Sequence, residues 1–476
     1  MRVTFQAFAS ITAMCLIGTM ADVTQSDSKH DPLSLDQLGI LERDVAVIGG
    51  GSAGTYAAIR LRELGQSLVV IENQDRLGGH SNTYFDTATG IAVPYGVISF
   101  HHKSVVTDYF SHFNISLVNK IYLTNQTKNV DFTTGEPITL KPITLPSDDP
   151  EVRIAIENYK AQLAKYPFLE DEYYNLPDPI PEDLLLPFGQ FAAKYKIGAI
   201  VRVIAGYTAG FGDPLLKLTL YMLKIFSLEF IYEIQHGFLN YPMNDNSVLY
   251  RAAEKELGRD VLYKSRVIGA MRKLSEIDHS SYILAQTPSG QKLIHAKKIL
   301  IAVPQTIENL IPFGLDRIER GIFTQFTGTF WYSSLIRNIY HSAPSINNNA
   351  HDTPYNLPIL PGVYSLRNTD VPGLNWVLYG SSTFMHNEEV KKDIVDSLLR
   401  IRHPNVAVRE PEIVAFKSHS PYELTVPVQA IRDGFYRKLD ALQGHRGTYY
   451  TGAALTAHES HTIWGFTEKL LLKYFV

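Results

Sequence analysis

The sequence predicts an α/β fold that starts with a strand, a glycine-rich turn and a helix. An apolar β-type run, Asp44 to Ile48, leads directly into Gly49-Gly50-Gly51-Ser52-Ala53-Gly54. The segment from Ala53 to Leu64 has the pattern of one amphipathic helix. A second apolar strand, Ser67 to Ile71, follows and ends at Glu72. This order is typical of a Rossmann-type dinucleotide-binding unit.

The three glycines of the turn have the spacing G-x-G-x-x-G, and each has its own physical role. Gly49 permits the tight turn, Gly51 lets the backbone approach a pyrophosphate, and Gly54 allows the helix to pack against the strand. Around Ser52 and Ala53, the free N–H groups and the positive end of the helix dipole favour phosphate. A glycine-rich turn in some other α/β protein is the alternative, and the strand and helix context argues against it.

Glu72 opens a second glycine-rich element of the form E-x-x-x-R-x-G-G-H, which ends at His80. Its carboxylate comes 18 residues after the last glycine of the first turn, where an acceptor for ribose hydroxyls is expected. Arg76 can contact a phosphate bidentately, and Gly78 and Gly79 allow close approach of the backbone. A nicotinamide-binding unit does not need this second element, whereas an FAD-binding unit of the amine-oxidase type does.

With these two elements the chain resembles the FAD-dependent amine oxidase superfamily. The usual R-x-G-G-R of that family is changed here, because His80 replaces the last arginine. The segment Arg266-Val267-Ile268 is similar to the family strand whose backbone meets the adenine, so the resemblance implies that Val267 contacts the cofactor.

The C-terminal segment continues the resemblance. Gly447 to Ala453 and the following helix are similar to the family's flavin motif, which implies that Gly452 and Ala453 contact the pyrophosphate and ribitol. The helix backbone at Ile463 and Trp464 would then face flavin O2 and stabilise negative charge on the reduced ring. An ordinary strand, turn and helix is the alternative for this block.

Within the superfamily, the chain looks most like fungal β-cyclopiazonate dehydrogenase-like flavoenzymes. This narrower resemblance rests on the G-G-H variant, on an N-terminal secretion signal and on Tyr95-Gly96-Val97-Ile98, whose Val97 it places at the cofactor. It implies a two-electron, hydride-abstracting oxidation of an indole alkaloid or terpenoid intermediate. The 27 Tyr and 23 Phe residues allow an aromatic pocket for such a substrate, although aromatic residues mostly serve the core.

A hydride-abstracting oxidation can leave a proton for a base, and the candidates are Tyr95, His101 and His461. His101 and its neighbour His102 could instead be an ordinary loop pair. His458 and His461 are three residues apart, but no third ligand is evident, so no metal is predicted.

One dinucleotide fingerprint is present, which predicts that the organic substrate reduces the flavin and that O2 or another acceptor reoxidises it. The close alternative is an amine oxidase that releases H2O2, although its usual lysine beside the flavin cannot be placed. A secreted flavin-binding protein without activity is the alternative of another class.

The composition and the N-terminal residues indicate the expected cellular compartment and exclude some classes of partner. The 476 residues carry a net charge of −4, which makes nucleic acid an unexpected partner. Arg2, a mostly apolar stretch and Thr19-Met20-Ala21 predict a cleaved signal peptide over 1–21, with a membrane anchor as the alternative. Cleavage removes the only cysteine, Cys15, and no later membrane span is expected. Two sequons, at Asn114 and Asn125, suit a glycosylated chain in the secretory pathway.

The three separate segments that carry cofactor motifs, near the N-terminus, at 266–268 and at the C-terminus, predict that the FAD-binding domain is discontinuous. One cofactor must contact all of them, so the chain must leave this domain and return twice. We expect an FAD domain from 42–110, 240–310 and 435–476, and an α+β substrate domain from 111–239 and 311–434. A hydrophobic small-molecule substrate would bind between the two domains.

Overall fold

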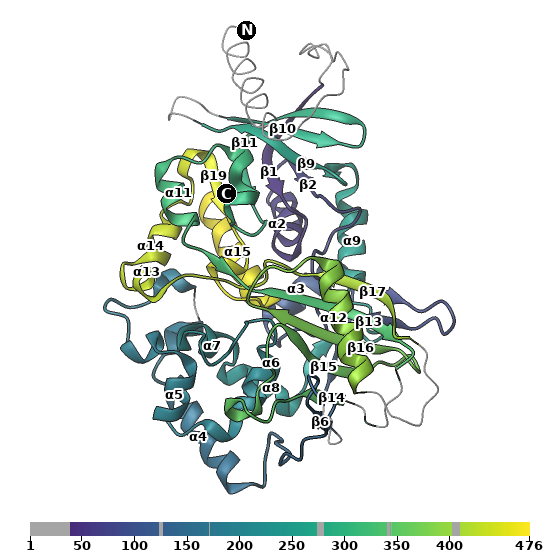
Figure 1. The fold of residues 1–476 in the computed structure, drawn as a ribbon. Helices are drawn as coiled ribbons and strands as arrows, with labels where there is room; N and C mark the ends of the chain where they lie inside the picture. Colours follow the sequence, from purple (N-terminus) through teal and green to yellow (C-terminus); the bar gives the residue numbers. More distant parts are fainter. Residues whose placement is uncertain are drawn as a thin grey trace, which may run out of the picture.

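The computed structural model describes residues 39–476 apart from 123–126, 171, 274–279, 340–342, 344 and 402–409. The predicted signal peptide, Cys15 and Asn125 therefore lie outside the described residues. Figure 1 shows one sheet in the upper part of the molecule, a second sheet at lower right and a group of helices at lower left. Within the part of the chain that is described, no helix combines the length and apolar character needed to cross a bilayer.

The upper sheet has seven strands in the order β8-β2-β1-β11-β10-β9, with β19 also paired to β11. Its strands are β1 (Ile40–Ile48), β2 (Leu68–Ile71), β8 (Val261–Leu262), β9 (Arg266–Met271), β10 (Ser281–Thr287), β11 (Gly290–Ile301) and β19 (Thr448–Tyr450). The central pairs β1–β2, β1–β11 and β11–β19 are parallel, and β9, β10 and β11 are antiparallel. Three distant blocks of the chain therefore meet in one sheet, and the carboxyl ends of β1, β11 and β19 lie at one edge.

Strand β11 is continuous although its sequence predicts two strands. The run at 292–294 predicts one strand of a short hairpin and the apolar run from 298 predicts another, whereas one strand of 12 residues runs through both. β10 pairs with residues 290–296 of this strand, β19 pairs with 299–301, and β1 pairs with most of its length, from Leu293 to Ile301. The long strand is therefore both part of a hairpin and the centre of the parallel sheet.

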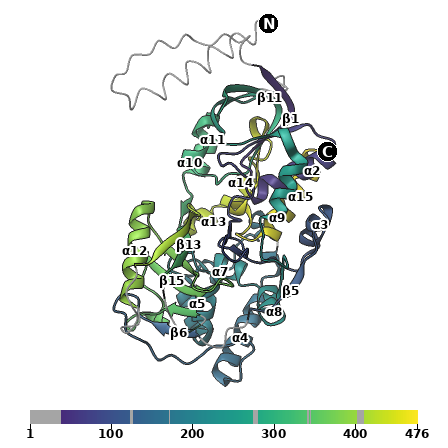
Figure 2. The ribbon, with the colours of Figure 1, turned by 90° about the vertical axis from the view of Figure 1, so that its right-hand side faces the viewer.

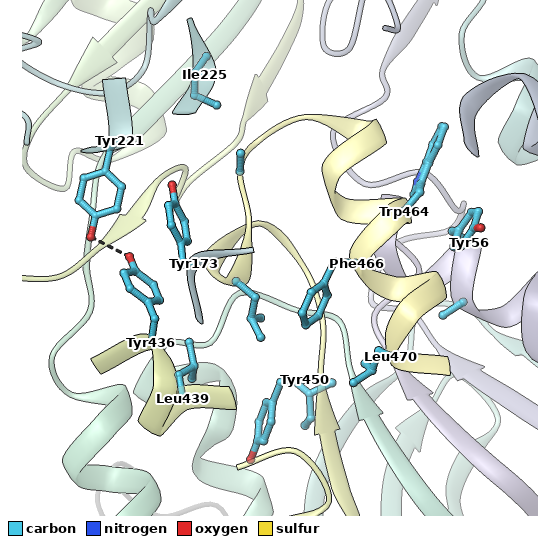
Figure 3. Close-up of a cluster of buried hydrophobic side chains, with 14 of the residues drawn as sticks. Tyr56, Tyr173, Tyr221, Ile225, Tyr436, Leu439, Tyr450, Trp464, Phe466 and Leu470 are labelled. Carbon is cyan, nitrogen blue, oxygen red and sulfur yellow. Dashed lines mark hydrogen bonds between the residues drawn. The ribbon is translucent and has the colours of Figure 1, made fainter. Parts of the chain in front are cut away.

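Helices α2 (Ser52–Glu63), α3 (Ser104–His112), α9 (Val248–Leu257) and α15 (Ser460–Tyr474) pack beside this sheet. α2 has small, buried residues on its inner side and contacts both α9 and α15. The Tyr56 ring stacks on the Trp464 ring with their centroids 5.9 Å apart. Figure 3 shows this pair on one side of α15, with Phe466 and the bonded Tyr221 and Tyr436 hydroxyls on the other.

The second sheet has six strands in the order β17-β13-β16-β15-β14-β6. They are β6 (Thr127–Val130), β13 (Phe330–Arg337), β14 (Ser345–Asn348), β15 (Gly362–Asn368), β16 (Asn375–Ser381) and β17 (Glu412–Ser418). Helix α12 (Asn387–Arg400) covers one face, where buried Val390 and Ile394 belong to the same apolar cluster as Leu366 and Val377. The parallel pairing of β6 with β14 joins the first excursion of the chain to the second.

The remaining helices belong mostly to the lower left of Figure 1 and are seen from another side in Figure 2. They are α4 (Pro150–Leu163), α5 (Phe188–Lys194), α6 (Val201–Tyr207), α7 (Thr219–Ile225) and α8 (Leu228–His236), with α10 (Ile307–Leu310), α11 (Arg317–Phe323), α13 (Val428–Arg432) and α14 (Phe435–Asp440) nearer the upper sheet. Short strand pairs complete the fold: β3 (Thr83–Phe85) with β4 (Ala92–Pro94), β5 (Val118–Lys120) with β7 (Phe238–Asn240), and β12 (Thr327–Gly328) with β18 (Leu424–Thr425). The apolar pattern from Pro214 to Phe230 predicts one helix, whereas the structure has two, because the Ser227 hydroxyl accepts the Phe230 N–H and starts α8.

Candidate functional site

The turn between β1 and α2 forms one end of a deep cavity. Gly49 has φ +97°, and a Cβ on Gly54 would lie 1.8 Å from the Gly49 carbonyl oxygen, so both positions require glycine. Gly51 caps α2 without a side-chain hydrogen bond, and Ser52 and Ala53 line the cavity behind it. The first N–H groups of α2 are therefore available to an anionic ligand.

The second glycine loop packs directly against this turn. Gly78 donates its N–H to Gly50 O at 2.8 Å, and a Cβ on Gly78 would clash with the Tyr250 ring. A Cβ on Gly79 would lie 3.0 Å from Gly51 Cα, so these two glycines face each other across the cavity wall. Gly79 lines the cavity, whereas Gly78 serves packing between the loop and α9.

Arg76 has a different place from the one predicted. Its guanidinium donates to the carbonyl oxygens of Leu77, Gly79 and Ser81 at 2.9–3.1 Å and to the Asn82 side chain. It is absent from the cavity lining, and its donors point into its own loop. The geometry therefore gives Arg76 the role of shaping the glycine loop and offers no support for a bidentate phosphate contact.

Glu72 is buried at the end of β2 and lines the cavity. Its Oε2 accepts the Gly50 N–H at 2.6 Å, and its Oε1 accepts the Gln74 N–H at 2.7 Å. Each oxygen has a second lone pair that can accept a hydrogen bond from a ligand hydroxyl. The carboxylate therefore ties both glycine elements together at the predicted ribose position.

Val267 lies in β9 at the edge of the upper sheet, and it is not among the residues that line the cavity. The segment before it is near the predicted ribose end, because Ser265 donates its N–H to the Glu72 carbonyl at 2.8 Å. The predicted adenine contact of Val267 stays a prediction.

The C-terminal block reaches the same cavity from β19. Gly452 has φ +119°, and no atom lies within 4 Å of the position of a Cβ there. Gly452 and Ala453 line the cavity. The Gln305 side chain donates to the carbonyls of Val303 and Thr451 at 2.9 and 3.0 Å, which fixes this strand end beside the end of β11. The open space at Gly452 and Gly51 leaves a cradle that an extended pyrophosphate fits.

Helix α15 starts earlier than the predicted flavin contact. Its N-cap is Glu459, and the Ile463 N–H already donates to the Glu459 carbonyl at 3.1 Å. The unbonded N–H groups of such a helix are those of its first turn, so they belong to Ser460 to Thr462 and not to Ile463 or Trp464. The Ile463 side chain lines the cavity, whereas the Trp464 ring is buried and its Nε1 donates to Ser52 Oγ at 2.9 Å.

The cavity extends from these glycine elements into the space between the two sheets and the helices. Its volume is about 1860 Å³, whereas a pocket for one drug-sized ligand has roughly 300–1,000 Å³. Val97 lines it on the upper side, and Phe230 and Phe238 line it on the helical side. The second sheet contributes Trp331 and Trp376. The cavity therefore has room for a dinucleotide and for a second molecule beside it.

The three predicted bases have different environments. Tyr95 is half-buried in a small cluster with Leu335 and Leu374 and does not line the cavity, so it is not placed to act on a ligand there. His101 lines the cavity, and the His461 ring lies 4.3 Å from it.

His101 is held between two carboxylates. Its Nδ1 lies 2.5 Å from Glu233 Oε2, and its Nε2 lies 3.3 Å from Glu459 Oε1. Burial opposes charge on this ring, but Glu459 and Glu233 together raise the pKa of His101 to about 10. Burial and the His101 charge lower the pKa of His461, which is therefore neutral. His101, Glu459 and His461 have ligand atoms within 4.8 Å of one another, a spacing that a metal ion could use. The ion pairs of His101 account for this cluster without an ion.

A group of stacked rings beside the second glycine loop was not foreseen. His80 lines the cavity, and its ring stacks on His419 at 4.4 Å and 20°. Burial and the charges of Lys417 and Arg76 lower the pKa of His80 to about 4. The Asn82 side-chain nitrogen is 3.0 Å from His419 Nε2. The R-x-G-G-H pattern pointed to His80, but its partner His419 comes from a segment with no motif.

Two further residues that the sequence singled out, His102 and Asn114, lie on the surface. His102 is exposed, and its backbone N–H donates to Glu233 Oε1 at 2.7 Å, so it belongs to the loop and not to the cavity. Asn114 is exposed just after α3. Asn125 lies outside the described residues.

Comparison with known proteins supplies an independent view of this site. Residues 47–113 match the model of the NAD(P)-binding Rossmann-like domain. The chain is 36% identical over 446 residues to the FAD-dependent oxidoreductase oblC of Cochliobolus heterostrophus, with 91% of each chain covered. It is 35% identical over 466 residues to the FAD-dependent oxidoreductase dbaF of Emericella nidulans, with 96% of this chain and 95% of that one covered. It is 31% identical over 442 residues to the beta-cyclopiazonate dehydrogenase of Aspergillus oryzae, with 92% and 94% covered.

Solved structures with the same fold have little sequence in common with this chain. A fatty acid isomerase from P. acnes superposes with a TM-score of 0.73 at 19% identity, covering 91% of this chain and 99% of the other. Putrescine oxidase with putrescine bound gives 0.65 at 16% identity, covering 92% and 100%. These similarities show the fold alone, and they confirm the α/β architecture predicted from the sequence.

Proposed function

Because this chain belongs to the family of fungal FAD-dependent oxidoreductases that includes beta-cyclopiazonate dehydrogenase, we propose that it oxidises a secondary-metabolite intermediate by removal of a hydride. The cofactor is FAD, and the residues of the cavity fit it. The observation that carries the proposal is the continuity of one cavity from the glycine cradle of Gly51, Gly79 and Gly452 to a space walled by aromatic rings.

The upper end of the cavity would hold the cofactor. The first N–H groups of α2 would bind its pyrophosphate, and Glu72 would accept hydrogen bonds from the ribose hydroxyls. The open space at Gly452 would leave room for the pyrophosphate and ribitol of the cofactor. Bound FAD supplies a two-electron acceptor for hydride. The first turn of α15 offers its N–H groups and dipole to negative charge at the end of the site beside Ala453.

The remaining part of the cavity would bind the substrate. Phe230, Phe238 and Trp331 provide an apolar surface that excludes water and orients a polycyclic molecule. His101 is protonated at neutral pH, so it cannot accept a proton there. It instead supplies a positive charge at the cavity wall, beside Glu459. His461 is neutral because burial and the neighbouring His101 charge lower its pKa, which makes it a weak proton acceptor, and it is outside the cavity lining.

Cofactor release and anaerobic reduction test the proposal together. Denatured protein should release FAD in near-stoichiometric amount, and release of NAD or of no nucleotide would contradict it. Under anaerobic conditions, indole alkaloids or terpenoids should bleach the flavin absorbance of the intact protein. Bleaching by amines alone, with H2O2 formed on admission of air, would assign the chain to the amine oxidases. FAD that no compound of the panel bleaches would favour a flavin-binding protein.

We also propose that the chain enters the secretory pathway. The charge and apolar pattern of 1–21 support this route, and so does the exposed side chain of Asn114, because a glycosylated asparagine must be accessible. Expression in a fungal host should give a protein that begins near Asp22 and loses mass on deglycosylation. A retained Met1 without glycan would contradict the proposal.

A further inference from the structure

Among the described residues, one cation in the cavity wall has no hydrogen-bond acceptor for its side-chain donors. Four lysine and arginine side chains of the described residues line the cavity, and three of them have a partner: Lys141 pairs with Asp149, Arg202 donates to Lys141 O at 2.8 Å, and Lys417 donates to Gln74 Oε1 at 2.7 Å. Within the described part of the chain, the Arg367 guanidinium makes no hydrogen bond or ion pair. Its N–H groups are left to whatever occupies the cavity.

The second sheet holds Arg367 in a defined place. It lies in β15 between Ser345 of β14 and Trp376 of β16. The guanidinium carbon is 5.6 Å from the centroid of the Trp376 ring, a cation–π distance. The Trp376 ring is itself fixed, because its Nε1 donates to Ser333 Oγ at 2.7 Å. The planar cation therefore lies against a fixed aromatic surface, and no described residue accepts a hydrogen bond from it.

No carboxylate among the residues that the structure describes pairs with Arg367. Burial lowers the pKa of Arg367, and the group that opposes this shift is Tyr207 rather than an acid. Asp370 also lines the cavity, but its Oδ2 accepts from the Asn244 side chain at 2.6 Å. A guanidinium stays charged in proteins and carries five donors. Arg367 is half-buried in the cavity wall, so an acceptor that binds in the cavity can reach these donors.

We propose that Arg367 binds an acidic oxygen group of the substrate, a carboxylate or an acidic enolate, while Trp376 packs against the same end of the molecule. This inference rests on the proposed function, because it assigns this part of the cavity to the substrate. The two oxygens of a carboxylate match the two parallel donors of a guanidinium, and an enolate oxygen can accept one of them. The proposed substrate class thereby narrows to polycyclic molecules that carry an acidic oxygen group.

Calorimetric titration of the purified holoprotein with matched probe pairs tests the inference. The pairs are indolebutyrate with its methyl ester, for the carboxylate, and dimedone with its enol methyl ether, for the enolate. Loss of a charged hydrogen bond weakens binding roughly 10- to 150-fold. Wild type should therefore bind one or both acids more tightly than the matching ester or ether by that factor. Arg367→Met should bind acid and ester alike. Arg367→Lys should keep part of the preference as a point charge.

Arg202→Met is the matched control, because Arg202 lines the same cavity but is bonded to a carbonyl; it should keep the wild-type preference. The inference would be overturned if wild type and Arg367→Met preferred the acid over its ester or ether to the same degree, or if wild type bound neither acid. Arg367→Met purified without FAD would also overturn it, because the arginine would then serve the cofactor. Calorimetry does not depend on flavin reduction, so a failure of the anaerobic bleaching experiment leaves this result interpretable.

Discussion

A substitution at Gly51 most directly separates an effect on folding from an effect on cofactor binding. Its backbone has φ −71° and ψ −167°, a conformation that alanine adopts without strain. A Cβ at Gly51 would meet only the Cα of Gly79, at 4.0 Å. Gly54 is different, because a Cβ there would lie 1.8 Å from a backbone carbonyl oxygen and the turn would have to move. Gly51→Ala should therefore fold, whereas Gly54→Ala should not fold normally.

The added methyl group in Gly51→Ala would point into the space through which the pyrophosphate approaches. Without cofactor, the free energy of unfolding should stay within about 0.5 kcal/mol of wild type, as for substitutions that disturb no contact. With cofactor, an inserted methyl in a closely packed contact costs about 1–3 kcal/mol. This cost corresponds to FAD binding that is about 5- to 150-fold weaker.

The assay is FAD titration followed by flavin fluorescence, together with thermal unfolding with and without excess FAD. Wild type should be stabilised by FAD in proportion to the logarithm of ligand over Kd, and Gly51→Ala should lose part of that gain. Gly465→Ala is the control, because Gly465 lies in α15 with no atom within 4 Å of a Cβ, and its FAD affinity should be unchanged. Wild-type FAD affinity in folded Gly51→Ala would refute the assignment of this turn to the pyrophosphate.

Three further outcomes follow from the contacts of single residues. Glu72→Ala should weaken FAD binding by about 10- to 150-fold, because the ribose and two backbone N–H groups lose a charged acceptor; unchanged FAD retention on gel filtration would refute this. His101 has a folded-state pKa raised from 6.5 to about 10, so its stabilisation is complete below pH 6.5 and is lost as the pH rises to about 10. Urea titrations should therefore show the stability gap between wild type and His101→Phe narrowing over that window, by at most about 1.4 kcal/mol per pH unit; a gap that widens would contradict the ion pairs. Arg272→Met should lower the free energy of unfolding by about 3–5 kcal/mol, because it leaves buried Glu319 without the guanidinium 2.6 Å away; adding Glu319→Leu should restore much of the loss, and no recovery in the double variant would contradict this account.

The sequence alone determined the parts of the site that depend on backbone chemistry. The need for glycine at Gly49 and Gly54 could be predicted from spacing, because a positive φ at the first and a close backbone approach at the second exclude a side chain. The approach of the pyrophosphate to Gly51 stays a prediction. The apolar period from Val248 to Leu257 and the glycine that follows are local signals, and they predict a helix with the bounds observed. The FAD-dependent family was also identified from these local motifs, and the relatives confirm it.

Only the tertiary structure decided which side chains meet, because such contacts join segments that are distant in the sequence and leave no local pattern. Arg76 looked like a phosphate ligand, but the fold supplies carbonyl acceptors for its donors. His101 looked like a base, but Glu233 from α8 and Glu459 from the start of α15 make it a cation. Arg367 carried no signal at all in the sequence. Its importance comes from the absence of a partner in the described cavity wall, which depends on the position of every neighbouring strand and helix.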